Sequence, residues 1–230
     1  QPPSTVHLLG TDRYGRDMLS RVIMGAQASV LSAGIVVAAE AVIGTSIGAH
    51  CAYFGGTMDT FVMRVADMCL AFPALVFALA VTAVLHGGIE TAMLALLVIG
   101  WPKYARLARS QTLMLKEKPF IAAAQLAGTS PKQMMIRHIL PNISSTIMTT
   151  AALDMGTVMM ELAALSFLGL GAKPPLAEWG SMMNVGRSML QTYPWVVFAP
   201  GMAIFITVSI FNLLGDSLRD YWDTRKKGSV

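Results

Sequence analysis

The sequence contains few charged residues and few cysteines. Only 13% of its 230 residues are charged and 54% are hydrophobic, whereas soluble domains carry about 25% charged residues. This deficit excludes an ordinary soluble domain and predicts an integral membrane protein. The two cysteines, Cys51 and Cys69, form neither a Cys-x-x-Cys pair nor a ligand pattern with histidine. They predict buried, inert thiols.

Motifs for independent catalysis are also missing. The chain has no Gly-x4-Gly-Lys-Ser/Thr phosphate loop, so we expect no ATP hydrolysis by this chain alone. No Ser/His or paired-Asp constellation supports a membrane-embedded enzyme. The seventeen methionines are scattered and the four histidines form no i, i+4 pair, which argues against a metal relay because methionine commonly fills gaps in apolar cores. We therefore expect no catalytic residue, no metal, no cofactor and no nucleic-acid partner.

Five apolar runs are long enough to cross a bilayer as helices, which takes about 20 mostly apolar residues. They are too long for membrane β-strands and lack the two-residue alternation of such strands. The sequence therefore predicts an all-α, polytopic transmembrane helical bundle. The predicted spans are 28–51, 68–86, 89–108, 143–168 and 195–215.

Lysine and arginine are divided unequally between the loops. Twelve of the seventeen lie in 52–67, 103–142 and the tail, and five lie in the alternate loops. Because cytoplasmic loops are enriched in these residues, we expect 103–142 and the C-terminus to be cytoplasmic. A chain that starts outside predicts an earlier helix before Gln1, six in total. The expected parts are an extracytoplasmic segment 1–27, a transmembrane domain 28–218 and a cytoplasmic tail 219–230.

A polar stretch, 117–142, lies between two predicted spans and carries the local signals of a helical hairpin. Pro119 suits the first turn of a helix, and Gly128 suits the left-handed position just past its end. Ser130, Pro131 and Gln133 predict a new helix with an N-cap and a capping box.

The second helix of this hairpin should have one apolar face with a basic rim. The face is formed by Met134, Met135, His138 and Ile139, which are spaced to group on one side of a helix. Two interpretations remain open from the residues alone: an ordinary amphipathic loop, or a docking element for a cytosolic partner.

Three acidic residues lie inside predicted spans: Glu40, Asp154 and Glu161. Asp154 and Glu161 are seven residues apart, about two helical turns, so they share a face. Ionisable groups at bilayer depth are costly and usually face the bundle interior or water. We expect them to line a pathway or a subunit interface, or else to form hydrogen bonds where helices cross.

The stretch 122–142 resembles the EAA loop of ABC importer permeases, Glu-Ala-Ala-x3-Gly-x9-Ile-x-Leu-Pro. Ala123, Ala124, Gly128, Leu140 and Pro141 stand at matching positions. Two positions depart from the pattern, with Ala122 in place of the usual Glu and His138 in place of the usual Ile. Further segments resemble the dipeptide, oligopeptide and nickel branch: HLLGTDRYGRDMLSRV (7–22), FGGTMDTFVMRVADMCLAFP (54–73), LSFLGLGAKPPLAEWGSMM (165–183) and FNLLGDSLRDYWD (211–223).

This resemblance implies a type I importer permease fold in a bacterial cytoplasmic membrane. It implies four protein partners: a second homologous permease subunit, two ABC ATPase subunits that carry ATP and Mg, and an extracytoplasmic solute-binding protein. The hairpin would be the coupling helix seated on an ATPase. The implied coupling residues are Ala123, Ala124, Gly128, Ser130, Pro131, Met134, Met135, His138, Leu140 and Pro141.

Two questions stay open at this point. A stand-alone secondary transporter or channel is the alternative function, although it would leave the cytoplasmic hairpin without a purpose. The solute also stays open among peptides, nickel, metal chelates and opines.

Overall fold

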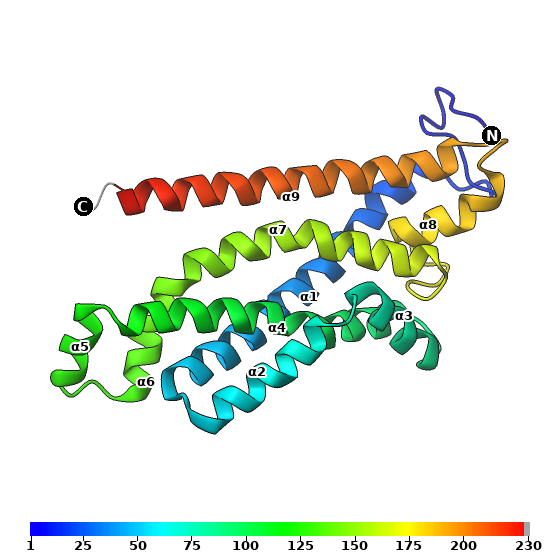
Figure 1. Ribbon diagram of the computed structural model, residues 1–230. Helices are drawn as coiled ribbons and strands as arrows, with labels where there is room; N and C mark the ends of the chain where they lie inside the picture. The colour runs from blue at the N-terminus through cyan, green and yellow to red at the C-terminus, as the bar shows by residue number, and fades with distance from the viewer. Residues whose placement is uncertain (228–230) are drawn as a thin grey trace.

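The protein is helical throughout, apart from loops and an isolated antiparallel bridge between Thr11 and Asp17. The computed structural model describes residues 1–227, with side chains described as far as Trp222. These residues confirm the all-α prediction (Figure 1). In chain order the elements are α1 (Met18–Phe54), α2 (Gly56–Leu70), α3 (Ala74–Val84), α4 (Ile89–Lys116), α5 (Pro119–Leu126), α6 (Pro131–Gln133), the π-helical turn η1 (Met134–Ile139), α7 (Leu140–Phe167), α8 (Trp179–Gly186), the 3-10 turn η2 (Arg187–Met189) and α9 (Trp195–Lys227).

Three helical segments are long and apolar enough to cross a membrane by length and composition. They are Met18–Phe54, Pro131–Phe167 and Trp195–Trp222, which match the first, fourth and fifth predicted spans. The expected tail 219–230 lies only partly within the described residues, where it continues α9 as far as Lys227.

The second predicted span, 68–86, is wrong as one straight helix. The chain forms α2 and α3 instead, bent by 85° at a short break. Pro73 provides the physical reason, because it has no N–H to continue the helical hydrogen bonds. Its extended backbone, with ψ of 121°, places it as the N-cap of α3.

The third predicted span, 89–108, lies inside the longer helix α4. Lys103, Arg106 and Arg109 in the second half of α4 lower its apolar character. By length and composition the described residues therefore hold three spanning helices, or four if the bent pair counts as one. The position of α4 is set by its packing against α1. Among the described elements, no other pair packs as extensively as α1 and α4.

Small residues allow α1 and α4 to approach closely. A side-chain carbon placed on Gly48 would lie 2.0 Å from the Ala105 carbonyl oxygen, and one on Gly44 would lie 2.4 Å from that of Trp101. Four-residue spacing of small residues is a common way to pack helices in membranes, where apolar side chains gain little from leaving lipid. This contact was not among the sequence predictions.

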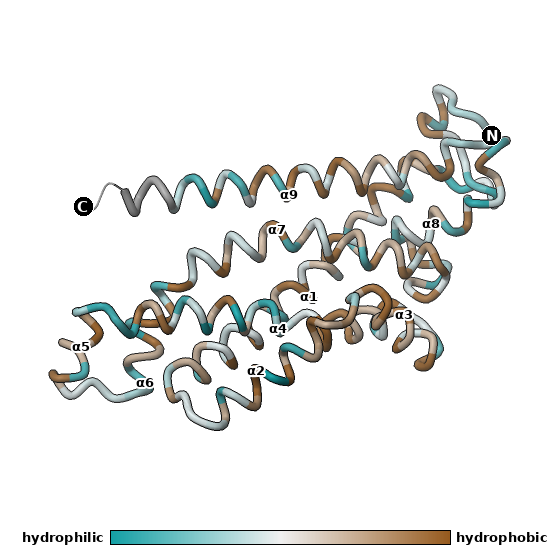
Figure 2. The backbone as a smooth tube through the Cα atoms, in the orientation of Figure 1, coloured by the Kyte–Doolittle hydropathy of each residue, from teal (hydrophilic) through white to brown (hydrophobic). Residues whose placement is uncertain are grey.

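The two ends of the bundle hold different connections. The hairpin helices α5 and α6 and the C-terminal end of α9 lie at one end, and the chain N-terminus and α8 lie at the other (Figure 1). Figure 2 shows hydrophilic residues in the second half of α4 and the last part of α9, near the hairpin end. The loops that share an end are those that the lysine and arginine pattern grouped together.

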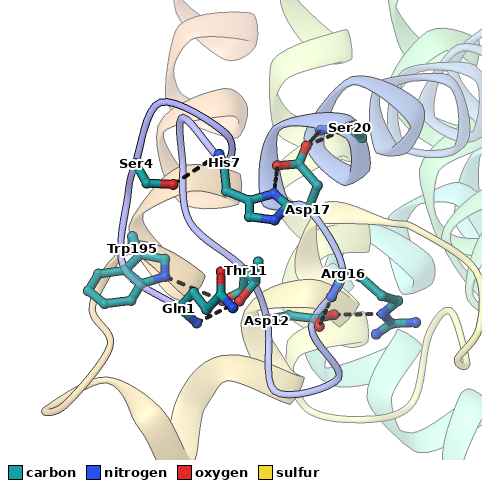
Figure 3. Close-up of polar contacts among 9 residues, drawn as sticks. All are labelled: Gln1, Ser4, His7, Thr11, Asp12, Arg16, Asp17, Ser20 and Trp195. Atoms are coloured by element: carbon teal, nitrogen blue, oxygen red, sulfur yellow. Dashed lines mark hydrogen bonds and ion pairs between the residues drawn. The ribbon is translucent and has the colours of Figure 1, made fainter.

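Local polar contacts fold the segment before α1 (Figure 3). Asp12 accepts hydrogen bonds from the backbone N–H groups of Tyr14 (2.8 Å) and Arg16 (3.0 Å) and from Arg16 Nε (2.7 Å). Burial alone would raise the pKa of Asp12, but these donors outweigh burial and lower that pKa. Asp17 caps α1 by accepting from Ser20 N (2.8 Å) and also contacts His7 Nδ1 (3.0 Å).

The segment 169–194 packs against this N-terminal segment. Glu178 caps α8 by accepting hydrogen bonds from Gly180 N (2.9 Å) and Ser181 N (2.8 Å). The indole of Trp179 donates to the Val22 carbonyl at 2.9 Å. These contacts join the segment 169–194 and the segment 1–27, which was predicted to lie outside the membrane, into one folded surface at the α8 end.

Candidate functional site

The hairpin at residues 119–139 has the caps that its sequence predicts. Helix α5 begins with Pro119 in its first turn, and Gly128 has a φ of +80°, the left-handed conformation. Ser130 and Gln133 form the predicted capping box, with both side-chain to backbone distances at 3.4 Å. Pro131 is the first residue of α6. Each of these local predictions is confirmed.

The apolar face of the second hairpin helix lies largely against the protein itself. Met134 and Ile139 are fully buried, and they pack with Ile121, Ile143 and Tyr104 in a core cluster of the protein itself. An apolar face lowers its free energy most by packing on the nearest apolar surface, and here that surface is the end of the bundle. Met134 therefore anchors the hairpin and cannot touch a partner directly.

The outward surface of the hairpin is formed by other residues. Leu126, the last residue of α5, is 91% exposed, and Ile136 and Phe120 are 55% and 45% exposed. Leu126 was not among the residues predicted from the sequence, because its exposure depends on how the hairpin packs on the bundle. The other expected coupling residues divide by exposure. Ala123, Gly128, Ser130, Pro131 and Pro141 are exposed, and Ala124, Met135, His138 and Leu140 are half-buried.

Ion pairs fix the helix that leads into the hairpin. The Arg109 guanidinium donates twice to the Asp59 carboxylate, at 2.7 Å each, and Arg106 pairs with Asp67. Lys116, the last residue of α4, donates to the carbonyl oxygens of Ala52 (3.1 Å) and Tyr53 (3.0 Å) at the end of α1. Favourable charge at a helix C-terminus adds to this contact. The hairpin thus continues from a helix that is tied to both α1 and α2.

The structure brings the three acidic residues of the spans together. Glu40 of α1 and Asp154 of α7 are each 4% exposed, and electrostatic interactions connect Glu40 with Asp154, Glu161 and Lys103. Lys103 of α4 donates a hydrogen bond to Asp154. The Glu40 carboxylate occupies the space beside Gly100, where a side-chain carbon would lie 2.0 Å from its Oε1. We call Glu40, Asp154, Glu161 and Lys103 the intramembrane charge cluster.

Lys103 and Gly100 were not predicted as members of this cluster. The sequence shows that Asp154 and Glu161 share a helical face, but Glu40 is more than a hundred residues away from them in the chain. Only the crossing of α1, α4 and α7 brings Lys103 into contact with Asp154 and places Glu40 and Glu161 within electrostatic range of them.

A bundle of apolar helices with a capped hairpin at one end and buried charges between its helices is the architecture of a polytopic membrane protein. Comparison with known proteins assigns this protein to a family. The model of the binding-protein-dependent transport system inner membrane component family matches residues 41–228. The chain belongs to this family.

Two curated relatives support this assignment over almost the whole chain. The glutathione transport system permease protein GsiD of Escherichia coli O6:K15:H31 (strain 536 / UPEC) is 44% identical over 226 residues, which is 98% of this chain and 75% of that protein. The dipeptide transport system permease protein DppC of Alkalihalophilus pseudofirmus is 39% identical over 227 residues, or 99% of this chain and 75% of that protein.

The fold also matches a solved structure. A chain of the inward-facing MetNI methionine ABC transporter aligns with a TM-score of 0.67 at 18% identity, covering 88% of this chain and 97% of that chain. At this identity the likeness shows the fold, which is that of a type I importer permease. Together with the family assignment, it identifies the chain as a membrane-embedded permease subunit of an ABC importer.

Proposed function

We propose that this permease subunit serves an importer of short peptides and that the hairpin 119–139 docks on an ABC ATPase subunit. The peptide class rests on the relatives, one of which is a glutathione permease and the other a dipeptide permease. Two ATPase subunits, a second permease subunit and an extracytoplasmic binding protein complete the proposed assembly. In this assembly the hairpin and the C-terminus face the cytoplasm.

Leu126 carries the docking proposal. It is 91% exposed at the tip of a hairpin whose second helix is anchored by Met134 and Ile139. An exposed apolar residue on a rigid support is suited to fill a pocket on a partner, where a few such anchors supply most of the binding free energy. Lys118, Lys132 and Arg137 are exposed on the same hairpin and provide a basic rim. The rigid core behind the tip lets a displacement of the ATPase move the helices of the bundle.

Substitution of Leu126 tests the docking proposal. We expect Leu126→Asp to lower solute-stimulated ATP hydrolysis and uptake in proteoliposomes by about tenfold or more, because it places a carboxylate in an apolar contact worth about 1.4 kcal/mol or more. Leu126→Met is the matched control and should keep both activities. Insertion and pairing with the second permease should be unchanged, since the side chain contacts little of its own protein. Normal uptake by Leu126→Asp would overturn the docking role.

The folded surface made by 1–27 and 169–194 is the proposed site for the binding protein. Val6 is 80% exposed on this surface. A cysteine at Val6 should cross-link to the binding protein in the assembled transporter, and a cysteine at Leu126, at the opposite end, should cross-link to an ATPase instead. The reverse pattern would show that the proposed orientation is wrong.

A further inference from the structure

Helix α7 has a polar face along most of its length. Thr146, Thr150, Asp154, Thr157 and Glu161 follow one another at intervals of three or four residues, so they lie on one side of the helix. Thr157 is exposed, and Thr146, Thr150 and Glu161 are half-buried. Polar and ionisable groups in a membrane span are costly against lipid and usually face water or other protein. This face of α7 is therefore the side that lipid does not cover.

A hollow continues the polar face toward the hairpin end of the bundle. It lies between α7 and the last turns of α9. Its lining includes Ser145, Thr146, Thr149 and Thr150 of α7 and Arg219 of α9. Leu153 and Trp222 complete the lining. The polar side of α7 thus borders an open space into which hydroxyl groups and Arg219 project among apolar side chains.

The charge cluster on this face has more carboxyl groups than ammonium groups. Three carboxylates face a single ammonium group, that of Lys103, which is hydrogen-bonded to Asp154. Glu40 is 96% removed from solvent, being only 4% exposed, and it makes no hydrogen bond with any other described residue. A buried carboxylate without a donor is strongly destabilising, so the site favours an added group that brings positive charge and N–H donors.

A second buried group beside the cluster also lacks a partner. The hydroxyl of Tyr104 is fully buried, and no described residue offers it a hydrogen bond of acceptable geometry. Asp154 and Glu40 both act on it electrostatically, so it lies near these carboxyl groups. Its oxygen is a further acceptor, and its O–H a further donor, for a group held between them.

The chemistry of these groups selects the type of cation. No group of three or more histidine, cysteine, aspartate or glutamate side chains within the described residues has the geometry to hold a metal ion. A primary ammonium group carries one positive charge and three donors, and it needs only acceptors placed around it. Glu40, Glu161 and Tyr104 supply those acceptors while Lys103 occupies Asp154.

We propose that the polar face of α7 is a wall of the solute pathway and that Glu40, Glu161 and Tyr104 form a station for the primary ammonium group of the passing solute. The inference rests on the proposed peptide-import function and adds the part of the solute that the permease recognises. The free amino terminus of a short peptide is such a group. The station would favour solutes that carry an amine at the point where the pathway is least hydrated.

Cysteine accessibility in the assembled transporter tests whether this face meets water. In a background with Cys51→Ala and Cys69→Ala, we expect Thr157→Cys and Thr150→Cys to react with charged, membrane-impermeant methanethiosulfonates. Met148→Cys is the matched control, because Met148 is 57% exposed on the opposite side of the same helix. Fast reaction at 148 with none at 157 would overturn the pathway assignment. These reactions report water contact of α7 and do not require ATP hydrolysis, so a failed docking proposal and a failed pathway proposal give different results.

Charge preference at Thr157→Cys tests the station. After correction for intrinsic reactivity, a trimethylammonium reagent should react about tenfold faster than a sulfonate reagent, because nearby negative charge concentrates cations. Adding Glu40→Gln and Glu161→Gln should remove most of that preference. Alanyl-alanine should slow the cationic reaction and acetyl-alanyl-alanine should not. The ammonium station would be overturned by any of three results: equal reaction of the two reagents, equal effects of the two peptides, or an unchanged preference in the double variant. An unchanged preference would assign the charge effect to other residues.

Discussion

The hairpin and the intramembrane charge cluster are both polar interruptions of an apolar protein, but they are stabilised in different ways. The hairpin is built from residues close together in the chain, such as Ser130 with Gln133, which cap one another within a single turn. The charge cluster joins Glu40 of α1, Lys103 of α4, and Asp154 and Glu161 of α7 across three helices. The comparison shows that a local polar motif keeps its shape through its caps, whereas a dispersed one depends on how closely the helices pack.

Among the substitutions considered, one at the close contact of α1 and α4 should reduce the stability of the protein most. Gly48→Ala places a carbon 2.0 Å from the Ala105 carbonyl oxygen, which forces α1 and α4 apart and costs about 1–3 kcal/mol. We expect less assembled transporter and a lower melting temperature of the purified complex. Gly34→Ala on the same helix is the matched control, because its nearest neighbour would be Met155 Cε at 3.9 Å. If the two variants melt alike, close packing does not hold the cluster in place.

The hairpin should respond to backbone conformation more than to packing. Gly128 has a φ of +80° and nothing within 4 Å of an added side-chain carbon, so a substitution there changes only local strain. Gly128→Val should weaken coupled ATP hydrolysis, because a left-handed residue with a side chain costs about 1–2 kcal/mol. Gly128→Asn should retain most of the activity, since asparagine tolerates this conformation. Equal loss in both variants would point to a partner contact at residue 128 rather than to strain.

The N-terminal segment, like the hairpin, is stabilised by local hydrogen bonds. Its stability should depend on pH, because the acceptor is the carboxylate of Asp12. The pKa of Asp12 is lowered in the folded protein, so Asp12 adds stability at pH values above its unfolded pKa of about 4. That contribution is lost as the pH falls through the lower, folded pKa. We expect hydrogen exchange of the Tyr14 and Arg16 amides, corrected for intrinsic rates, to accelerate between neutral pH and about pH 3.

Asp12→Asn is the control for this experiment. It should exchange faster already at neutral pH and show little further change on acidification. A wild-type protein whose Tyr14 and Arg16 amides exchange at the same corrected rate over this range would contradict the assigned role of the Asp12 carboxylate.

The local features were predictable because their determinants lie within a few residues. Pro119, Gly128, Ser130 and Pro131 stand where the sequence analysis placed them, since caps and left-handed turns are set by neighbouring backbone groups. The break at Pro73 was visible in the sequence as well, but its effect on the second span was not recognised. The direction of the Met134 face could not be predicted, because periodicity identifies an apolar face without identifying what covers it.

The sequence by itself determined the membrane class, the positions of the long helices, the hairpin caps and the family. Composition and short motifs carry that information, and both are properties of a linear chain. Only the tertiary structure decided that Met134 faces inward, that Leu126 forms the exposed tip, and that Gly100 and Lys103 join Glu40 and Asp154 in one cluster. The physical reason is that burial and charge pairing depend on which helices touch, and small residues such as Gly48 set those contacts through space.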